Sequence, residues 1–120
     1  MSQVFQHDAL IIGSGAAGLA LAIKLADHCN VAVLSKTTLD DGSTRWAQGG
    51  IAAVLDTDDS VESHVQDTLV AGNNLCNEDA VRFTVENGKD SIDWLIQQGV
   101  PFTPNDEDNS DQPYHLTREG

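Results

Sequence analysis

The chain has 120 residues, 40% of them hydrophobic, and a formal net charge of −13 at pH 7. This length allows one domain with a buried core, and the acidic balance argues against nucleic acid or an anionic membrane as partner. No apolar run approaches the roughly 18 residues that cross a bilayer. The N-terminus, MSQVFQHD, lacks the basic and apolar regions of a signal peptide. We therefore expect a cytoplasmic protein.

The first 35 residues carry the pattern of a βαβ unit. Residues 8–13, DALIIG, form a short apolar run that ends in glycine, as is typical of a buried parallel strand. A helix pattern rich in Ala and Leu follows, and residues 31–35, VAVLS, form a second apolar strand. Strand, glycine turn, helix and strand within about 30 residues predict an α/β fold with a Rossmann-like, parallel βαβ unit over 8–35.

A glycine motif, GSGAAG at residues 13–18, lies between the first strand and the helix. This is the position that dinucleotide binding requires of a GxGxxG motif. Gly13 allows the tight turn, Gly15 lets the backbone approach a pyrophosphate, and Gly18 lets helix and strand pack closely. The N–H groups at the helix start favour phosphate. The alternative is a close-packed turn that holds no ligand.

The end of the second strand departs from the common dinucleotide pattern. Many such folds place an acid there to hold the adenosine ribose, whereas this chain has Ser35 and Lys36. A hydroxyl and backbone groups would have to hold the ribose instead. The sequence therefore gives no signal that separates NAD from NADP.

Residues 36–50 read as a polar loop, and residues 50–55, GIAAVL, as a short third strand. Apolar residues recur every four positions over 60–71, which predicts an amphipathic helix. Asp59 and Glu62 have the spacing of a capping box, and Gly72 would end this helix.

A second helix is expected from residue 78, with Asn77 as its cap. Asn87-Gly88 would break it in two, and Gly99 with Pro101 would end it, so the helical segment covers 60–99. Residues 103–113 are acidic without an apolar anchor and are predicted to be a mobile loop. The expected apolar faces comprise Val61, Val65, Leu69, Val81, Val85, Ile92, Leu95 and Ile96.

No metal site is expected. Asp56, Asp58 and Ser60 have the spacing of the start of a calcium loop, but the sixth position is Val61 and the twelfth is Asp67. We interpret these acids as a turn and a helix cap. The four histidines lack ligand spacing, and the two cysteines fit no metal or CxxC pattern, so we expect buried thiols in a reducing compartment.

The polar loop at 36–50 favours FAD over a nicotinamide cofactor. A simple nicotinamide-binding domain would continue with regular strand–helix units. FAD is longer than one crevice and must also be held at its flavin end. Small and hydroxyl side chains that end in Gly49-Gly50 can lie beside the flavin ring and offer backbone N–H groups to its edge.

GSGAAG, then LSK, then GSTRWAQGGIAAV are similar to the flavoprotein family of succinate dehydrogenase, fumarate reductase and L-aspartate oxidase. The resemblance covers essentially the whole chain and implies an oxidoreductase with FAD as cofactor. The implied cofactor-binding residues are Gly13, Ser14, Gly15, Ala16, Ala17, Gly18, Ser35, Lys36, Ser43, Thr44, Arg45, Trp46, Ala47, Gln48, Gly49 and Gly50.

Two positions discriminate between branches of this family. Members with covalent flavin carry a histidine where this chain has Ser43, so the resemblance implies non-covalent FAD. Residues 116–120, LTREG, are similar to the L-aspartate oxidase branch, in which Glu119 would orient the substrate by facing its ammonium group. The alternative is a surface acid that pairs with Arg118.

The resemblance implies oxidation of L-aspartate to iminoaspartate, with hydride passing from the α-carbon to FAD and with oxygen or fumarate reoxidising the flavin. The product would pass to quinolinate synthase, the pathway partner, in de novo NAD biosynthesis. Family members are several times longer, so we expect residues 1–120 to be the N-terminal part of the FAD-binding domain, inactive alone, with catalytic residues beyond Gly120.

Three alternatives stay open. The first is a fumarate reductase-type dicarboxylate oxidoreductase with non-covalent FAD and no membrane anchor. The second is a nicotinamide-dependent dehydrogenase domain. The third is an interaction module with an empty Rossmann turn, whose acidic residues 51–120 bind a basic partner; that half carries fifteen acids and three bases. The AQGGIAAV stretch argues against the last two.

Overall fold

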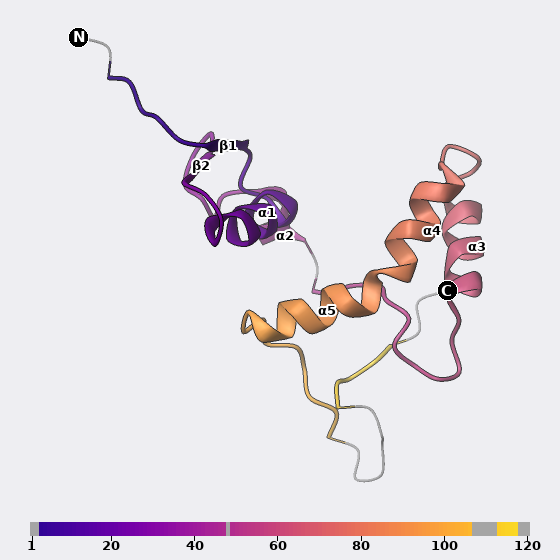
Figure 1. Ribbon diagram of the computed structural model, residues 1–120. Coiled ribbons are helices and arrows are strands. Elements are labelled where there is room, and N and C mark those ends of the chain that lie inside the picture. Colours follow the sequence, from indigo (N-terminus) through magenta and orange to yellow (C-terminus); the bar gives the residue numbers. More distant parts are fainter. Residues whose placement is uncertain (1–2, 48, 107–112, 118–120) are drawn as a thin grey trace. The chain divides into compact units, whose positions relative to one another are not determined.

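The chain folds into two compact units, residues 1–49 and 50–120. The computed structural model describes residues 3–47, 49–106 and 113–117 (Figure 1). None of the helices in these ranges is both long and apolar enough to span a membrane. The first unit contains β1 (Ala9–Ile12), α1 (Ala16–Ala26), β2 (Val31–Leu34) and α2 (Ser43–Trp46), and the second contains α3 (Val61–Ala71), α4 (Glu78–Glu86) and α5 (Gly88–Gln97).

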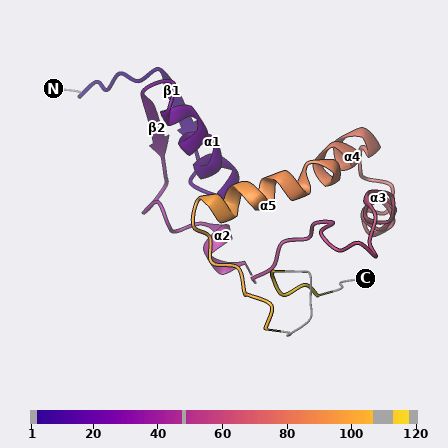
Figure 2. The ribbon, with the colours of Figure 1, turned by 60° about the horizontal axis from the view of Figure 1, so that its bottom comes forward.

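The first unit confirms the predicted βαβ arrangement. β1 and β2 pair in parallel, with Ala9 opposite Val31 and Ile12 opposite Leu34. The helix α1 forms the crossover that a parallel pair requires and lies beside both strands (Figure 2). Side chains of β1 alternate between half-buried and exposed, because successive residues of a strand point to opposite faces.

Residues 50–55 do not form the predicted third strand. The sheet of the described residues consists of β1 and β2 alone, and Ile51 is 56% exposed. A strand needs a neighbour with unpaired N–H and C=O groups, whereas the named elements of the second unit are all helices. The segment instead packs on the start of α5. If Gly88 carried a Cβ, that atom would lie 3.6 Å from Ala53 Cβ. A short apolar run does not distinguish these outcomes.

The start of α3 differs from the predicted capping box. Ser60, rather than Asp59, is the N-cap, and its Oγ accepts the Ser63 N–H at 3.1 Å. Asp59 accepts the Ser60 N–H through Oδ1 at 2.6 Å. Both residue types are good acceptors at a helix start, and spacing alone selected the wrong one. Gly72 is the C-cap, as predicted.

The predicted cap and break of the second helical segment are confirmed. Asn77 is the N-cap of α4, and its Oδ1 accepts the Ala80 N–H at 3.0 Å. Asn87 separates α4 from α5. Its side-chain amide donates to the Phe83 carbonyl at 2.8 Å, and the same carbonyl accepts the Asn87 backbone N–H at 3.3 Å.

The buried core of the described residues lies in the second unit. It consists of Val65, Val85 and Ile92, one from each of α3, α4 and α5. The other residues of the predicted apolar faces are half-buried, namely Val61, Leu69, Val81, Leu95 and Ile96. The helices α3 and α4 pack side by side in both views (Figures 1 and 2). The predicted faces are therefore confirmed as the packing surfaces.

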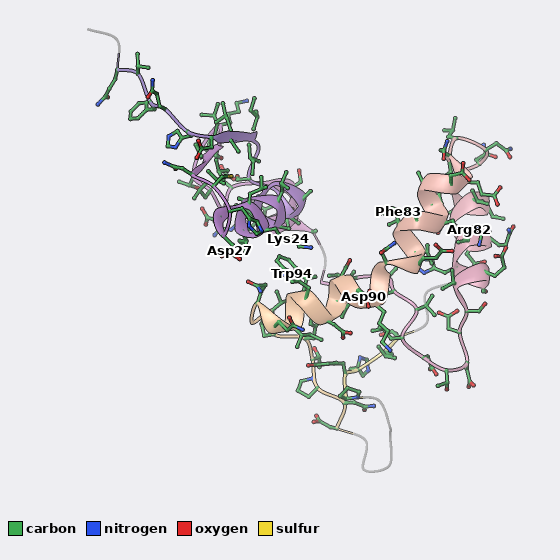
Figure 3. All side chains as sticks on the ribbon, viewed as in Figure 1. Lys24, Asp27, Arg82, Phe83, Asp90 and Trp94 are labelled. Carbon is green, nitrogen blue, oxygen red and sulfur yellow. The ribbon has the colours of Figure 1, made fainter. Side chains whose placement is uncertain are left out.

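Charged side chains also join α3 to α4. Arg82 Nη1 lies 2.9 Å from Glu62 Oε2, and its Nη2 lies 3.6 Å from Glu78 Oε1. Arg82 lies on the side of α4 that faces α3, whereas Phe83 points away from α3 (Figure 3) and is 69% exposed. The hydrogen bond from Arg82, with smaller contributions from Gln66 and from the Arg82 charge, lowers the pKa of the Glu62 carboxyl.

The two ends of the acidic stretch meet in the second unit. Pro104 and Tyr114 form an antiparallel bridge. The rings of Phe102 and Tyr114 pack edge to face, with centroids 6.1 Å apart. Most of the predicted mobile loop, residues 107–112, lies outside the described residues.

The cysteines are less buried than the sequence predicts. Cys29 and Cys76 are both free thiols and both half-buried. Cys76 Sγ donates weakly to the Thr68 carbonyl at 3.8 Å. Cys76 lies in the connection between α3 and α4, where its Sγ packs against Gly72.

Replacing the cap of α4 tests the second unit. Asn77→Ala is expected to lower the free energy of unfolding by about 1 kcal/mol, because the Ala80 N–H loses its acceptor. Asn77→Ser, the matched control, keeps a side-chain oxygen and most of the stability. Urea unfolding followed by far-UV circular dichroism measures both variants. An equal loss of unfolding free energy in both variants would show that the missing side-chain cap does not cause the destabilisation.

Replacing Glu62 tests the ion pair. Because the folded-state pKa of Glu62 is lowered from about 4.5, the carboxylate stabilises the fold above that pH and loses its effect as pH falls through the folded pKa. Glu62→Gln should therefore be slightly less stable than wild type at neutral pH, with the difference vanishing in acid. Glu86→Gln removes an exposed acid of α4 as a control. A difference that is unchanged from neutral pH into acid contradicts the role of the pair.

Candidate functional site

The candidate site is the turn between β1 and α1, residues 13–18, which we call the phosphate-binding turn after the group that the sequence predicts for it. Gly13 has φ +112°, a backbone conformation that favours glycine, and its N–H donates to the Leu34 carbonyl at 2.9 Å. A Cβ on Gly18 would collide with the Gly13 carbonyl oxygen and would reach Ile11 Cγ2 at 3.4 Å. The turn and the close packing predicted for these two glycines are both present.

The start of α1 offers backbone donors beside a bare backbone. Gly15 is the N-cap and supplies no side-chain cap. The Ala16 N–H donates to Thr44 Oγ1 at 3.1 Å, and a Cβ on Gly15 would meet that same oxygen at 3.6 Å. N–H groups and the helix dipole at such an end favour a phosphate group. The arrangement therefore fits the pyrophosphate of a dinucleotide.

Two hydroxyls join the turn to the end of β2. Ser14 Oγ lies 3.1 Å from Ser35 Oγ, and Ser35 Oγ donates to the Thr38 carbonyl at 3.1 Å. Because the single Ser35 proton points to Thr38, Ser14 is the donor to Ser35. Ser35 stands where the sequence predicts ribose contacts, and Lys36 follows with an exposed side chain.

The segment 36–50, which we call the flavin-binding loop after the ligand that the sequence predicts for it, contains a helical turn that the sequence does not predict. The helix α2 begins at Ser43, after Gly42 as N-cap. Arg45 Nη1 lies 2.6 Å from Asp40 Oδ2, so the Arg45 charge is neutralised within the loop. The Arg45 guanidinium also lies 5.7 Å from the Trp46 ring centroid, and Trp46 is 75% exposed.

The structure brings Ser14, Ala16, Ser35 and Thr44 together, and Thr44 is the contact that sequence reasoning missed. The sequence places Thr44 among the residues that contact the flavin end of FAD. Its contact with the turn was not predicted because Thr44 and Ala16 are 28 residues apart in the chain. Among the described residues other than chain neighbours, no atom lies within 4 Å of a Cβ added to Gly49 or to Gly50. The predicted site residues Gln48 and Glu119 lie outside the described residues.

Asp56 and Asp58, before α3, form the turn that the sequence predicts. Asp56 Oδ1 accepts the Asp58 N–H at 3.1 Å, which is the pattern by which Asp stabilises such turns. Within the described ranges, no three His, Cys, Asp or Glu residues gather as a group that could hold a metal ion. Next to residues 116–120, the predicted substrate stretch, the backbone N–H of His115 donates to the Thr103 carbonyl at 2.9 Å.

Comparison with known proteins gives the same result for family and fold. The family model described as FAD binding domain matches residues 8–120. The chain is 64% identical to an L-aspartate oxidase of Pseudomonas aeruginosa, covering 100% of this chain and 23% of that protein. It is 58% identical to the enzyme of Yersinia pestis over 94% of this chain and 21% of the relative, and 56% identical to that of Vibrio cholerae over 96% and 22%. The chain thus spans less than a quarter of these relatives.

Two solved structures are similar over most of the chain. A mutant form of FrdA from E. coli quinol fumarate reductase has a TM-score of 0.81 at 35% identity, covering 88% of this chain and 18% of that one. The Mycobacterium smegmatis Sdh1 complex in its apo form has a TM-score of 0.76 at 27% identity, covering 90% and 20%. These likenesses confirm the predicted fold class.

Replacing Gly18 or Gly15 of the turn by alanine distinguishes a tightly packed position from one with room for a Cβ. Gly18→Ala is expected to lower the free energy of unfolding by about 1–3 kcal/mol, because its Cβ meets backbone that has to move. Gly15→Ala places its Cβ in ordinary contact with Thr44 and should lower it much less. Thermal unfolding of both variants tests this order, and a greater loss in Gly15→Ala contradicts it.

Proposed function

This chain belongs to the FAD binding domain family, and from that premise we propose that it is the N-terminal part of an L-aspartate oxidase. The observation that supports this most strongly is 64% identity to such an enzyme over 100% of this chain. The chain spans 23% of that relative, so activity is assigned to a longer protein. Residues 1–120 alone are expected to be inactive.

The proposed cofactor is FAD, held without a covalent bond. The phosphate-binding turn would hold the pyrophosphate through its N–H groups, and Ser35 with Lys36 would contact the adenosine ribose. The flavin-binding loop would place backbone N–H groups from Ser43 to Gly50 along the ring edge. Ser43 stands where covalent members of the family carry histidine, and a serine hydroxyl does not make that flavin bond.

When bound, FAD supplies the two-electron acceptor for the oxidation of L-aspartate to iminoaspartate. The residues of this chain bind and orient the cofactor, and the bare backbone at Gly49 and Gly50 would let the ring approach closely. Glu119 would face the ammonium group of L-aspartate, which dicarboxylates without an amino group lack. Oxygen or fumarate would reoxidise the flavin in the cytoplasm.

The rival function is a fumarate reductase-type enzyme with non-covalent FAD. The 35% identity and TM-score of 0.81 with FrdA support this candidate. The higher identity to three L-aspartate oxidases favours the oxidase. The two candidates share the cofactor site and differ in which substrate exchanges electrons with it.

The deciding measurement is an absorption spectrum of the complete gene product. We expect a flavin spectrum that bleaches when L-aspartate is added without oxygen and returns when air is admitted. Acid precipitation should release the flavin into the supernatant, because no covalent bond holds it. Malate, which carries a hydroxyl in place of the amino group, is the control and should leave the spectrum unchanged.

Other outcomes would correct specific parts of this proposal. Flavin that stays in the acid pellet would refute non-covalent binding. A flavin that L-aspartate does not reduce, but that fumarate reoxidises after chemical reduction, would favour the reductase. A colourless protein that takes up no added FAD would refute both candidates.

A further inference from the structure

One hydrogen bond joins the flavin-binding loop to the phosphate-binding turn. The Ala16 N–H donates to Thr44 Oγ1 at 3.1 Å. Within the described part of the chain, no other hydrogen bond directly connects residues 36–50 to residues 13–18. The Thr44 hydroxyl is therefore the direct link between loop and turn, beside an indirect link through the Ser35 hydroxyl, which bonds both Ser14 and the Thr38 carbonyl.

Apart from the bond between the Ser35 hydroxyl and the Thr38 carbonyl, the remaining bonds of the described loop residues are internal. Thr37 Oγ1 donates to Asp41 Oδ2 at 2.8 Å, and the Asp41 N–H donates to the Thr38 carbonyl at 3.1 Å. Together with the ion pair between Arg45 and Asp40, they hold the loop in shape without fixing its place. Ser35 holds only the beginning of the loop, at Thr38, whereas the Thr44 bond attaches the part that follows residue 42 directly to the turn.

Thr44 also completes the start of α1. The N-cap of that helix is a glycine, which has no side chain to accept a first-turn N–H. Thr44 supplies the missing acceptor from a residue far along the chain. Moving the loop would leave the Ala16 N–H without this partner, so the helix start and the loop are mechanically linked.

We propose that Thr44 is a positioning residue that couples the binding of the two ends of FAD. This inference rests on the proposed function, which assigns the phosphates to the turn and the ring to the loop. A ligand that fixes the turn also fixes the loop through the Thr44 hydroxyl, so the second ligand group meets a loop that is already ordered. The coupling is reciprocal, because each ligand must change the affinity of the other by the same factor.

Two fragments of the cofactor test this coupling on the complete apoprotein. Riboflavin carries the flavin ring, and ADP carries the adenosine and two phosphates. Flavin fluorescence gives the Kd of riboflavin with and without saturating ADP, and the Kd of FAD. Thr44→Val removes the hydroxyl at constant shape, and Thr44→Ser keeps it. Thr37→Val, the matched control, removes a hydroxyl of the same loop that bonds Asp41 instead of the turn.

In the wild-type protein, ADP should lower the Kd of riboflavin about fivefold or more, within the usual range of such couplings. Thr44→Val should abolish this effect and weaken FAD binding about three- to tenfold, as expected for one hydrogen bond. Thr44→Ser should restore the coupling, and Thr37→Val, which leaves the bond between loop and turn in place, should keep it. A residue that only stabilised the fold would change the unfolding temperature and leave the coupling intact.

Several results would overturn the inference. Coupling that persists in Thr44→Val is one, and tighter FAD binding by that variant is another, since the hydroxyl would then compete with a phosphate oxygen for the Ala16 N–H. Should Thr44→Val fail to fold, loss of coupling in Thr44→Ser decides against the inference. A wild-type protein that binds FAD without coupling its fragments refutes the inference alone. A wild-type protein that binds no FAD refutes the proposed function as well.

Discussion

The close approach of α1 to the end of β1 is the constraint on which the first unit depends. A side chain at Gly18 would occupy the space of the Gly13 carbonyl oxygen, so helix and strand meet only because residue 18 has no Cβ. That contact sets the helix start at the carboxyl ends of both parallel strands. Ligands bind at this edge in open α/β sheets, because free helix N–H groups gather there.

The hydroxyls around the turn follow from this placement. Once α1 begins beside the end of β2, Ser14 comes within 3.1 Å of Ser35, and the first-turn N–H of Ala16 is within reach of Thr44. The turn is thus held from two sides by short polar side chains. Such groups accept and donate hydrogen bonds at little conformational cost, which suits a surface proposed to receive phosphate groups.

Different interactions stabilise the second unit. Its helices are short and have only three buried side chains among the described residues, Val65, Val85 and Ile92. Side-chain oxygens of Ser60 and Asn77 cap α3 and α4, and Arg82 joins these helices at their exposed surface. Helices this short depend on packing against one another, and the caps and the ion pair add to the contacts of these three side chains.

The sequence by itself determined the features that arise from neighbouring residues. These include the βαβ order, the glycine turn at 13–18, the Asn77 cap and the break at Asn87-Gly88, because each depends on backbone preferences and hydrogen bonds within a few positions. The choice of Ser60 over Asp59 as cap is also local, and spacing alone did not resolve it. Only the tertiary structure decided whether residues 50–55 form a strand and whether Thr44 contacts Ala16. A strand needs a partner edge, and a hydrogen bond across 28 residues needs two segments to be brought together. Both depend on packing distant in sequence, which periodicity and spacing do not encode.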